Sequence, residues 1–181
     1  MILFFGPPGS GKSIQGRLLV ERNGWQWLST GQMFRDSQDP EVLTRLATGE
    51  LIDDHLTNTV VNDALENIEN DNKVVLDGYP RNTAQAAWLT EQLPQHDRHI
   101  QAVVVFDTPQ DELIKRLSGR GRSEDTPAVI EKRIDIYHRA TKPVLDYYKR
   151  RDVPVIEIDG VGSVEEVHDR IQKAVEACIP A

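Results

Sequence analysis

The sequence has little cysteine, few aromatic residues and no long apolar run. Cys178 is the single cysteine among 181 residues, so no disulfide can form within the chain. The apolar start of the chain is short, has no basic segment before it, and is interpreted as a first strand rather than a secretion signal. A reducing cytoplasm is therefore the expected compartment. No run approaches the roughly 20 apolar residues of a membrane-spanning helix, so no membrane association is expected.

The chain also lacks an excess of basic charge. Its 21 lysines and arginines are outnumbered by 29 aspartates and glutamates, which gives a net charge of −8. Proteins that bind nucleic-acid polymers usually carry a basic face, so such a polymer is not an expected partner. Four arginines nevertheless fall close together, at Arg116, Arg120, Arg122 and Arg133. A cationic cluster on an acidic protein suits a small polyanion such as a nucleotide.

Short apolar runs rich in β-branched residues alternate with longer helical patterns. The predicted strands are 2–5, 25–29, 74–77, 102–107 and 153–158. The predicted helices are 13–22, 42–47, 57–67, 83–93, 110–117 and 127–149, followed by a last helix that begins with a capping box at Ser163 and Glu166. The helical pattern over 127–149 should kink or break at Pro143. Residues 36–40 and 119–126 are predicted loops.

This alternation predicts an α/β fold of the P-loop type. Several of the strands are almost continuously apolar, as strands covered on both faces are. We expect three α/β/α layers around a five-stranded parallel sheet with right-handed crossovers. The length suits one domain over residues 1–181.

Residues 6–13 read GPPGSGKS and match the phosphate-loop pattern G-x-x-x-x-G-K-[ST] between a predicted strand and a predicted helix. Glycines let successive backbone N–H groups point at phosphate oxygens, and the helix adds its positive N-terminal end. Lys12 can then reach the β and γ phosphates, and Ser13 can offer a hydroxyl to Mg²⁺ or to a phosphate. A turn that binds nothing is the alternative, which the spacing and the strand–loop–helix context disfavour.

Further motifs follow in a characteristic order. They are Ser29-Thr30-Gly31, Gly49-Glu50-Leu51-Ile52, DGYPR at 77–81 with Gln85 four residues beyond its arginine, and the arginine cluster. Together with the phosphate loop, this order resembles the adenylate kinase family over nearly the whole chain. The resemblance implies a monomeric enzyme that transfers the γ-phosphoryl group of Mg·ATP to AMP and forms two ADP reversibly.

The resemblance also implies roles for individual positions. ATP would be bound by Gly9, Ser10, Gly11, Lys12, Ser13, Ile14, Arg120 and Gly162. AMP would be bound by Thr30, Gly31, Arg35, Glu50, Leu51, Ile52, Gly78, Tyr79, Pro80, Arg81, Gln85, Arg122 and Arg133. The catalytic residues would be Lys12, Arg81, Arg120, Arg122 and Arg133. Mg²⁺ would be held, mostly through water, by Ser13, Asp77 and Asp107. A small monophosphate-binding segment would cover 30–52 and a short lid 119–126.

These residue types suit phosphoryl transfer. The reaction requires in-line alignment and neutralisation of charge on the phosphoryl oxygens, with little covalent work by the protein. The amide of Gln85 offers a donor and an acceptor that can match the Watson–Crick edge of adenine. Thr30 stands where pyrimidine-specific relatives tend to carry a smaller residue, which also favours AMP. Asn82 points instead to UMP or CMP, because pyrimidine kinases often carry asparagine after the DGxPR arginine.

Two alternatives therefore stay open: a UMP/CMP kinase, and a regulatory module that binds nucleotide but transfers weakly or not at all. The chain departs from the family pattern at Ser13-Ile14, usually Gly-Thr, and at Gln32, usually Asp. Its lid is minimal and has no cysteine cluster, so a zinc-bearing lid is not expected. A small lid must still exclude water, and we expect some ATP hydrolysis when no acceptor is present.

Overall fold

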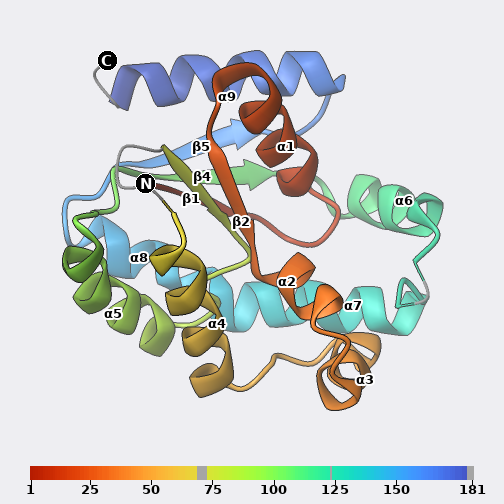
Figure 1. Ribbon diagram of the computed structural model, residues 1–181. Helices are drawn as coiled ribbons and strands as arrows, with labels where there is room; N and C mark the ends of the chain where they lie inside the picture. Colours follow the sequence, from red (N-terminus) through yellow and green to blue (C-terminus); the bar gives the residue numbers. More distant parts are fainter. Residues whose placement is uncertain (69–72, 123, 179–181) are drawn as a thin grey trace.

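The structure is a computed structural model that describes residues 1–68, 73–122 and 124–178. Five parallel strands form one sheet in the order β2-β3-β1-β4-β5 (Figure 1). Their bounds are β1 Ile2–Phe5, β2 Gln26–Ser29, β3 Val74–Asp77, β4 Ala102–Asp107 and β5 Val155–Asp159. The predicted P-loop α/β/α fold with a five-stranded parallel sheet is confirmed.

Helices cover both faces of the sheet, which explains the apolar strands. Alternate residues of a strand point to opposite faces. In β1, Ile2 and Phe4 pack in the cluster that includes α1 (Lys12–Asn23) and α9 (Val164–Cys178). Leu3 and Phe5 pack on the other side, against a larger group of helices. That group consists of α4 (Asp54–Glu66), α5 (Thr83–Gln92) and α8 (Pro143–Lys149), with the 3₁₀ turn η1 (Leu93–His96) after α5.

The helix α2 (Thr30–Asp36) lies where no helix was predicted. Its seven residues are too few to show a clear apolar period, although Thr30 and Phe34, four residues apart, are both buried. The next helix, α3 (Pro40–Thr48), begins two residues earlier than predicted. Asp39 accepts hydrogen bonds from two backbone N–H groups of its first turn, and proline occupies the first helical position.

The helical stretch before β5 breaks earlier than predicted. α7 (Pro127–Ile136) passes into a π-helical turn, η2 (Tyr137–Thr141), and α8 starts at Pro143. Proline has no N–H, and its ring would meet the carbonyl group four residues before it. The wider turn relieves that contact, and the backbone N–H of Lys142 bonds to the carbonyl of Tyr137 at 2.8 Å.

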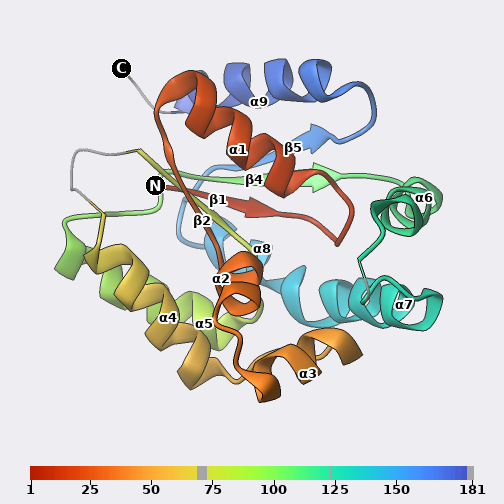
Figure 2. The ribbon, with the colours of Figure 1, turned by 45° about the vertical axis from the view of Figure 1, so that its right-hand side comes forward.

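The topology leaves a crevice at the carboxyl ends of the strands. The chain leaves β1 toward α1, while β3 and β4 lie on opposite sides of β1, so the connections diverge there. α6 (Gln110–Arg120) extends three residues beyond its predicted end and stands at this edge with α7 (Figure 1). The turned view shows α3 close to α7 (Figure 2). Over residues 1–68, 73–122 and 124–178, no helix has the length and apolar character needed to cross a membrane.

Candidate active site

A cavity of about 730 Å³ opens at the carboxyl ends of the strands. The phosphate loop, the DGYPR turn, α6 and the α7–η2 helix line it. Most of the residues to which the sequence assigned a role lie in its wall: Gly9, Ser10, Gly11, Lys12, Ser13, Ile14, Gly31, Arg35, Leu51, Asp77, Gly78, Tyr79, Pro80, Arg81, Arg120, Arg122, Arg133 and Gly162. The wall described by the structure does not include the other five, which are Thr30, Glu50, Ile52, Gln85 and Asp107.

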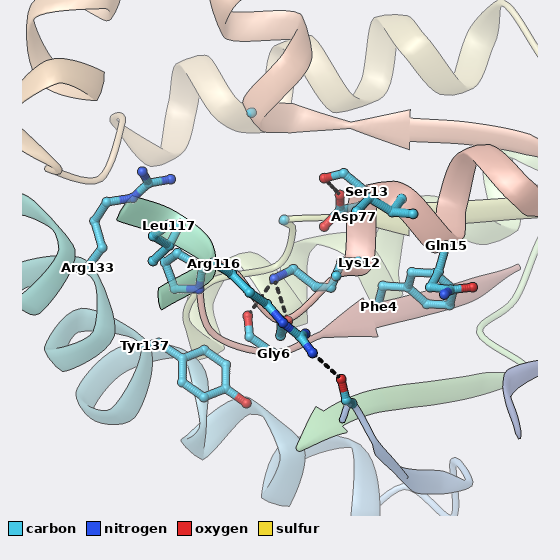
Figure 3. Close-up of a pocket in the computed structure, with 18 of the residues that line it drawn as sticks. Phe4, Gly6, Lys12, Ser13, Gln15, Asp77, Arg116, Leu117, Arg133 and Tyr137 are labelled. Atoms are coloured by element: carbon cyan, nitrogen blue, oxygen red, sulfur yellow. Dashed lines mark hydrogen bonds between the residues drawn. The ribbon is translucent and has the colours of Figure 1, made fainter. Parts of the chain in front are cut away.

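The phosphate loop curls around its own lysine. Gly9 and Gly11 have φ angles of +86° and +101°, which favour glycine. A Cβ atom on Gly9 would come within 2.9 Å of Leu117 Cγ. Lys12 Nζ donates to the carbonyl oxygens of Gly6 at 2.7 Å and Pro7 at 2.9 Å (Figure 3). The loop is therefore wrapped around the cation of its own lysine.

Lys12 is half-buried among other cations. Burial lowers the pKa of its ammonium group to about 8, the guanidinium groups of Arg81, Arg133 and Arg120 lower it further, and the carboxylate of Asp77 acts in the opposite sense. A cation held in such surroundings lacks a sufficient counter-charge. Phosphate oxygens entering the loop would provide it.

Two oxygen-bearing side chains meet beside the phosphate loop. Ser13 Oγ, on the first turn of α1, donates to Asp77 Oδ2 at the end of β3 at 2.9 Å (Figure 3). A hydroxyl and a carboxylate on the cavity wall suit Mg²⁺, which prefers a few protein oxygens and several waters. Asp107 lies differently, because its carboxylate is exposed and stands outside the wall, while its carbonyl accepts from the Gly160 N–H at 2.7 Å.

Five of the arginines that line the cavity were assigned a role from the sequence: Arg35, Arg81, Arg120, Arg122 and Arg133. Burial is the largest cause that lowers the pKa of Arg35, Arg81 and Arg122, and it lowers the pKa of Arg133 to about 10. Such perturbed cations in a cleft are typical of sites that bind anions.

Asp125, which lies between α6 and α7, supplies a carboxylate to this group. Asp125, whose side chain is 2% exposed, accepts from Arg120 Nε at 2.7 Å and Nη2 at 2.6 Å. Arg133 Nη1 lies 3.6 Å from the same carboxylate. Asp125 therefore ties the end of α6 to α7 and holds two of the five arginines near each other.

The DGYPR turn is braced from three elements. The carbonyl of Gly78 accepts from Thr30 Oγ1 at 3.0 Å and from Arg81 Nε at 2.7 Å. Thr141 Oγ1, in the π-helical turn, donates to the carbonyl of Arg81 at 3.0 Å. Gln85 is 2% exposed and its Oε1 accepts from the backbone N–H of Arg81 at 2.7 Å. Its role as a reader of the base stays a prediction.

The cavity wall also includes Arg116, which the sequence placed in the arginine cluster without assigning it to either nucleotide, and Tyr137. Arg116 Nη2 donates to the carbonyl of Gly160 at 3.0 Å, and so spans from α6 to the turn after β5 (Figure 3). Its position one helical turn before Arg120 was the available signal. Tyr137 lines the cavity as well, although its place in an apolar helical pattern suggests a core residue.

Comparison with known proteins identifies the family. Residues 4–153 match the family model described as adenylate kinase. The chain belongs to the adenylate kinase family. The adenylate kinase of Mycobacterium ulcerans is 39% identical over 180 residues, which cover 96% of this chain and 98% of that protein. The adenylate kinase of Pseudarthrobacter chlorophenolicus is 37% identical over 97% of this chain and 96% of its own length, and that of Salinibacter ruber is 34% identical over 97% and 98%.

The resemblance seen in the sequence is thus confirmed, and the chain is an enzyme of the adenylate kinase family. Its kinase and nucleotide-binding character follow from this membership. The matched relatives align over almost their full length.

Proposed function

We propose that this enzyme transfers the γ-phosphoryl group of Mg·ATP to AMP and forms two ADP in a reversible reaction. The observation that carries the proposal is the single cavity in which the phosphate loop, Lys12 and five arginines face one another. Two nucleotides that meet end to end bring several negative charges together. Catalysis of phosphoryl transfer is mainly a matter of holding them aligned and neutralising their charge.

The ATP end of the cavity is assigned to the phosphate loop. Its backbone N–H groups and the N-terminus of α1 would hold the phosphates, and Lys12 would exchange its two carbonyl partners for phosphate oxygens. Ser13 and Asp77 would hold Mg²⁺, which supplies positive charge to the phosphate oxygens when it is bound. Arg120 completes this end from α6.

The acceptor end is assigned to α2, the DGYPR turn and α7. Arg35 comes from α2, Arg81 from the turn and Arg133 from α7, so three separate elements each deliver a cation to the same cavity. Leu51 provides an apolar wall for a base. The groups assigned to both ends come from a single chain, which supports action as a monomer.

AMP is favoured over UMP and CMP as the acceptor, because Gln85 stands beside the acceptor arginine. Its Oε1 accepts from the Arg81 backbone N–H at 2.7 Å, and its amide offers both a donor and an acceptor to the Watson–Crick edge of adenine. The size of the lid sets a second property. With only one residue, Gly121, between Arg120 and Arg122, we expect measurable ATP hydrolysis without acceptor.

The test is ADP formation from Mg·ATP with AMP, GMP, CMP, UMP or no acceptor. AMP-dependent turnover that is lost in Arg81→Ala and on removal of Mg²⁺ supports the proposal. Arg22→Ala is the matched control, since Arg22 pairs with Glu165 on the outer face and should keep full activity. Turnover with CMP or UMP and not with AMP would show that the acceptor is a pyrimidine nucleotide. Tight ATP binding without any turnover would indicate a regulatory module.

A further inference from the structure

A carboxylate that no motif singles out joins the N-terminal ends of α4 and α5. Asp54, the first residue of α4, accepts from Asn82 Nδ2 at 3.0 and 3.1 Å and from Gln85 Nε2 at 2.7 Å. The positive ends of the two helices favour a negative charge at this point. The neighbouring Asp53 is the helix N-cap, because its side chain accepts hydrogen bonds from two backbone N–H groups of the first turn of α4.

These bonds leave the amide of Gln85 a single orientation. The backbone N–H of Arg81 can only donate, so the atom that faces it must be Gln85 Oε1. The carboxylate of Asp54 can only accept, so the atom that faces it must be Nε2. Rotating the amide by half a turn would place donor against donor and acceptor against acceptor. In many proteins the surroundings of an amide side chain do not decide which end is oxygen and which is nitrogen. The two partners of Gln85 do decide it.

Asp54 and Gln85 lie directly behind the proposed acceptor end, next to Leu51 and Arg81 of the cavity wall and outside that wall themselves. Asp54 follows the Glu50–Ile52 run by two residues, and Gln85 touches the backbone of Arg81. Gln85 keeps one N–H and one lone pair that these two partners do not use. Asp54 is half-buried, and its carboxylate oxygens retain lone pairs that can accept from a further donor.

We propose that Asp54 sets which bases the acceptor site takes, an inference that rests on the proposed acceptor function. It holds Gln85 in one orientation and places a carboxylate beside it. Together they favour a base with an exocyclic amino group, as in adenine and cytosine, over one with a keto oxygen at that edge, as in hypoxanthine and uracil. A keto oxygen would face carboxylate lone pairs with no proton between them, and a site that leaves polar groups unpaired rejects such a ligand.

The test compares AMP with IMP, which differ at the amino or keto edge. Asp54→Asn keeps the shape of the side chain but introduces a donor, so the amide of Gln85 is no longer held in one orientation. We expect the ratio of kcat/KM for AMP to that for IMP to fall about tenfold, through KM, while kcat with AMP and KM for ATP stay within about twofold. Asp54→Ser, a residue that suits a helix N-terminus, removes the carboxylate by a second route and should give the same fall.

The matched control is Asp53→Asn, which alters the neighbouring carboxylate and should keep the wild-type ratio. A ratio unchanged in both Asp54 variants overturns the inference and leaves AMP kinase activity standing. An equal loss of the ratio in Asp53→Asn also overturns it, because the effect would then be a general one of the helix end. A wild-type enzyme that phosphorylates no monophosphate overturns the proposed function and this inference together.

Discussion

The half-buried ammonium group of Lys12 makes ATP binding depend on pH. In the nucleotide-free protein its pKa is lowered to about 8, chiefly by burial. Phosphate oxygens would surround the ammonium group in the complex and favour its charged form. Binding therefore takes up a proton wherever the free lysine is neutral, and the affinity for ATP falls as pH rises through about 8.

The size of the effect follows from the two pKa values. If the bound lysine returns to its ordinary value of 10.5, the neutral fraction of the free protein sets the loss of affinity. Between pH 7 and pH 9 the dissociation constant should rise about tenfold, equivalent to about 1.4 kcal/mol. At pH 8 about half a proton should be taken up for each nucleotide bound.

Isothermal titration calorimetry measures both quantities. The ligand is β,γ-imido-ATP with Mg²⁺, which avoids hydrolysis, and two buffers of different ionisation enthalpy report proton uptake. Lys12→Met is the control, and its weaker binding should not vary with pH over this range. A wild-type dissociation constant that changes less than about twofold from pH 7 to 9 would refute the reasoning, as would the same pH dependence in Lys12→Met.

Three substitutions test other parts of the structure. Gly9→Ala should lower the free energy of unfolding by about 1–2 kcal/mol and weaken ATP binding, because the φ of Gly9 is +86° and α6 lies close to it. Gly119→Ala is the control and should not lower the free energy of unfolding, because Gly119 has open space around it. Leu76→Ala, fully buried in β3, should cost about 3 kcal/mol in urea unfolding, whereas Leu43→Ala on the exposed face of α3 should cost under about 0.5 kcal/mol. Thr141→Val removes the hydrogen bond to the DGYPR arginine and should raise the acceptor KM about fivefold without changing KM for ATP, as steady-state kinetics would show.

The layers of the fold could be predicted because their signals are local. Strands buried on both faces are apolar along their whole length, and β1, β3 and β4 were predicted with their observed bounds. β2 and β5 differ from their predicted bounds by one or two residues, since flanking apolar residues such as Trp25 and Val153 extend the pattern without joining the ladder. The short helix α2 and the π-helical turn could not be predicted, because backbone and packing constraints decide them rather than periodicity.

The parts of the site that are formed by contiguous sequence motifs could be predicted. The phosphate loop is contiguous in sequence, so its geometry follows from eight neighbouring residues. The contacts of Gln85 with Asp54, 31 residues earlier, depend on how α4 and α5 meet, which spacing does not show. The same holds for the pairing of Asp125 with Arg133 from the next helix. The individual roles, and the bounds 30–52 and 119–126 of the two substrate-binding segments, stay predictions.

The carboxylate of Asp125 has a consequence for the free energy of nucleotide binding. It already holds Arg120 and Arg133 near each other, so nucleotide binding exchanges one anion for another and does not gather scattered side chains. The entropy cost of ordering two long side chains is then met during folding rather than during binding. Added salt weakens the existing ion pairs as well as the new ones. The affinity for nucleotides should therefore depend on ionic strength less steeply than the number of arginines in the cavity suggests.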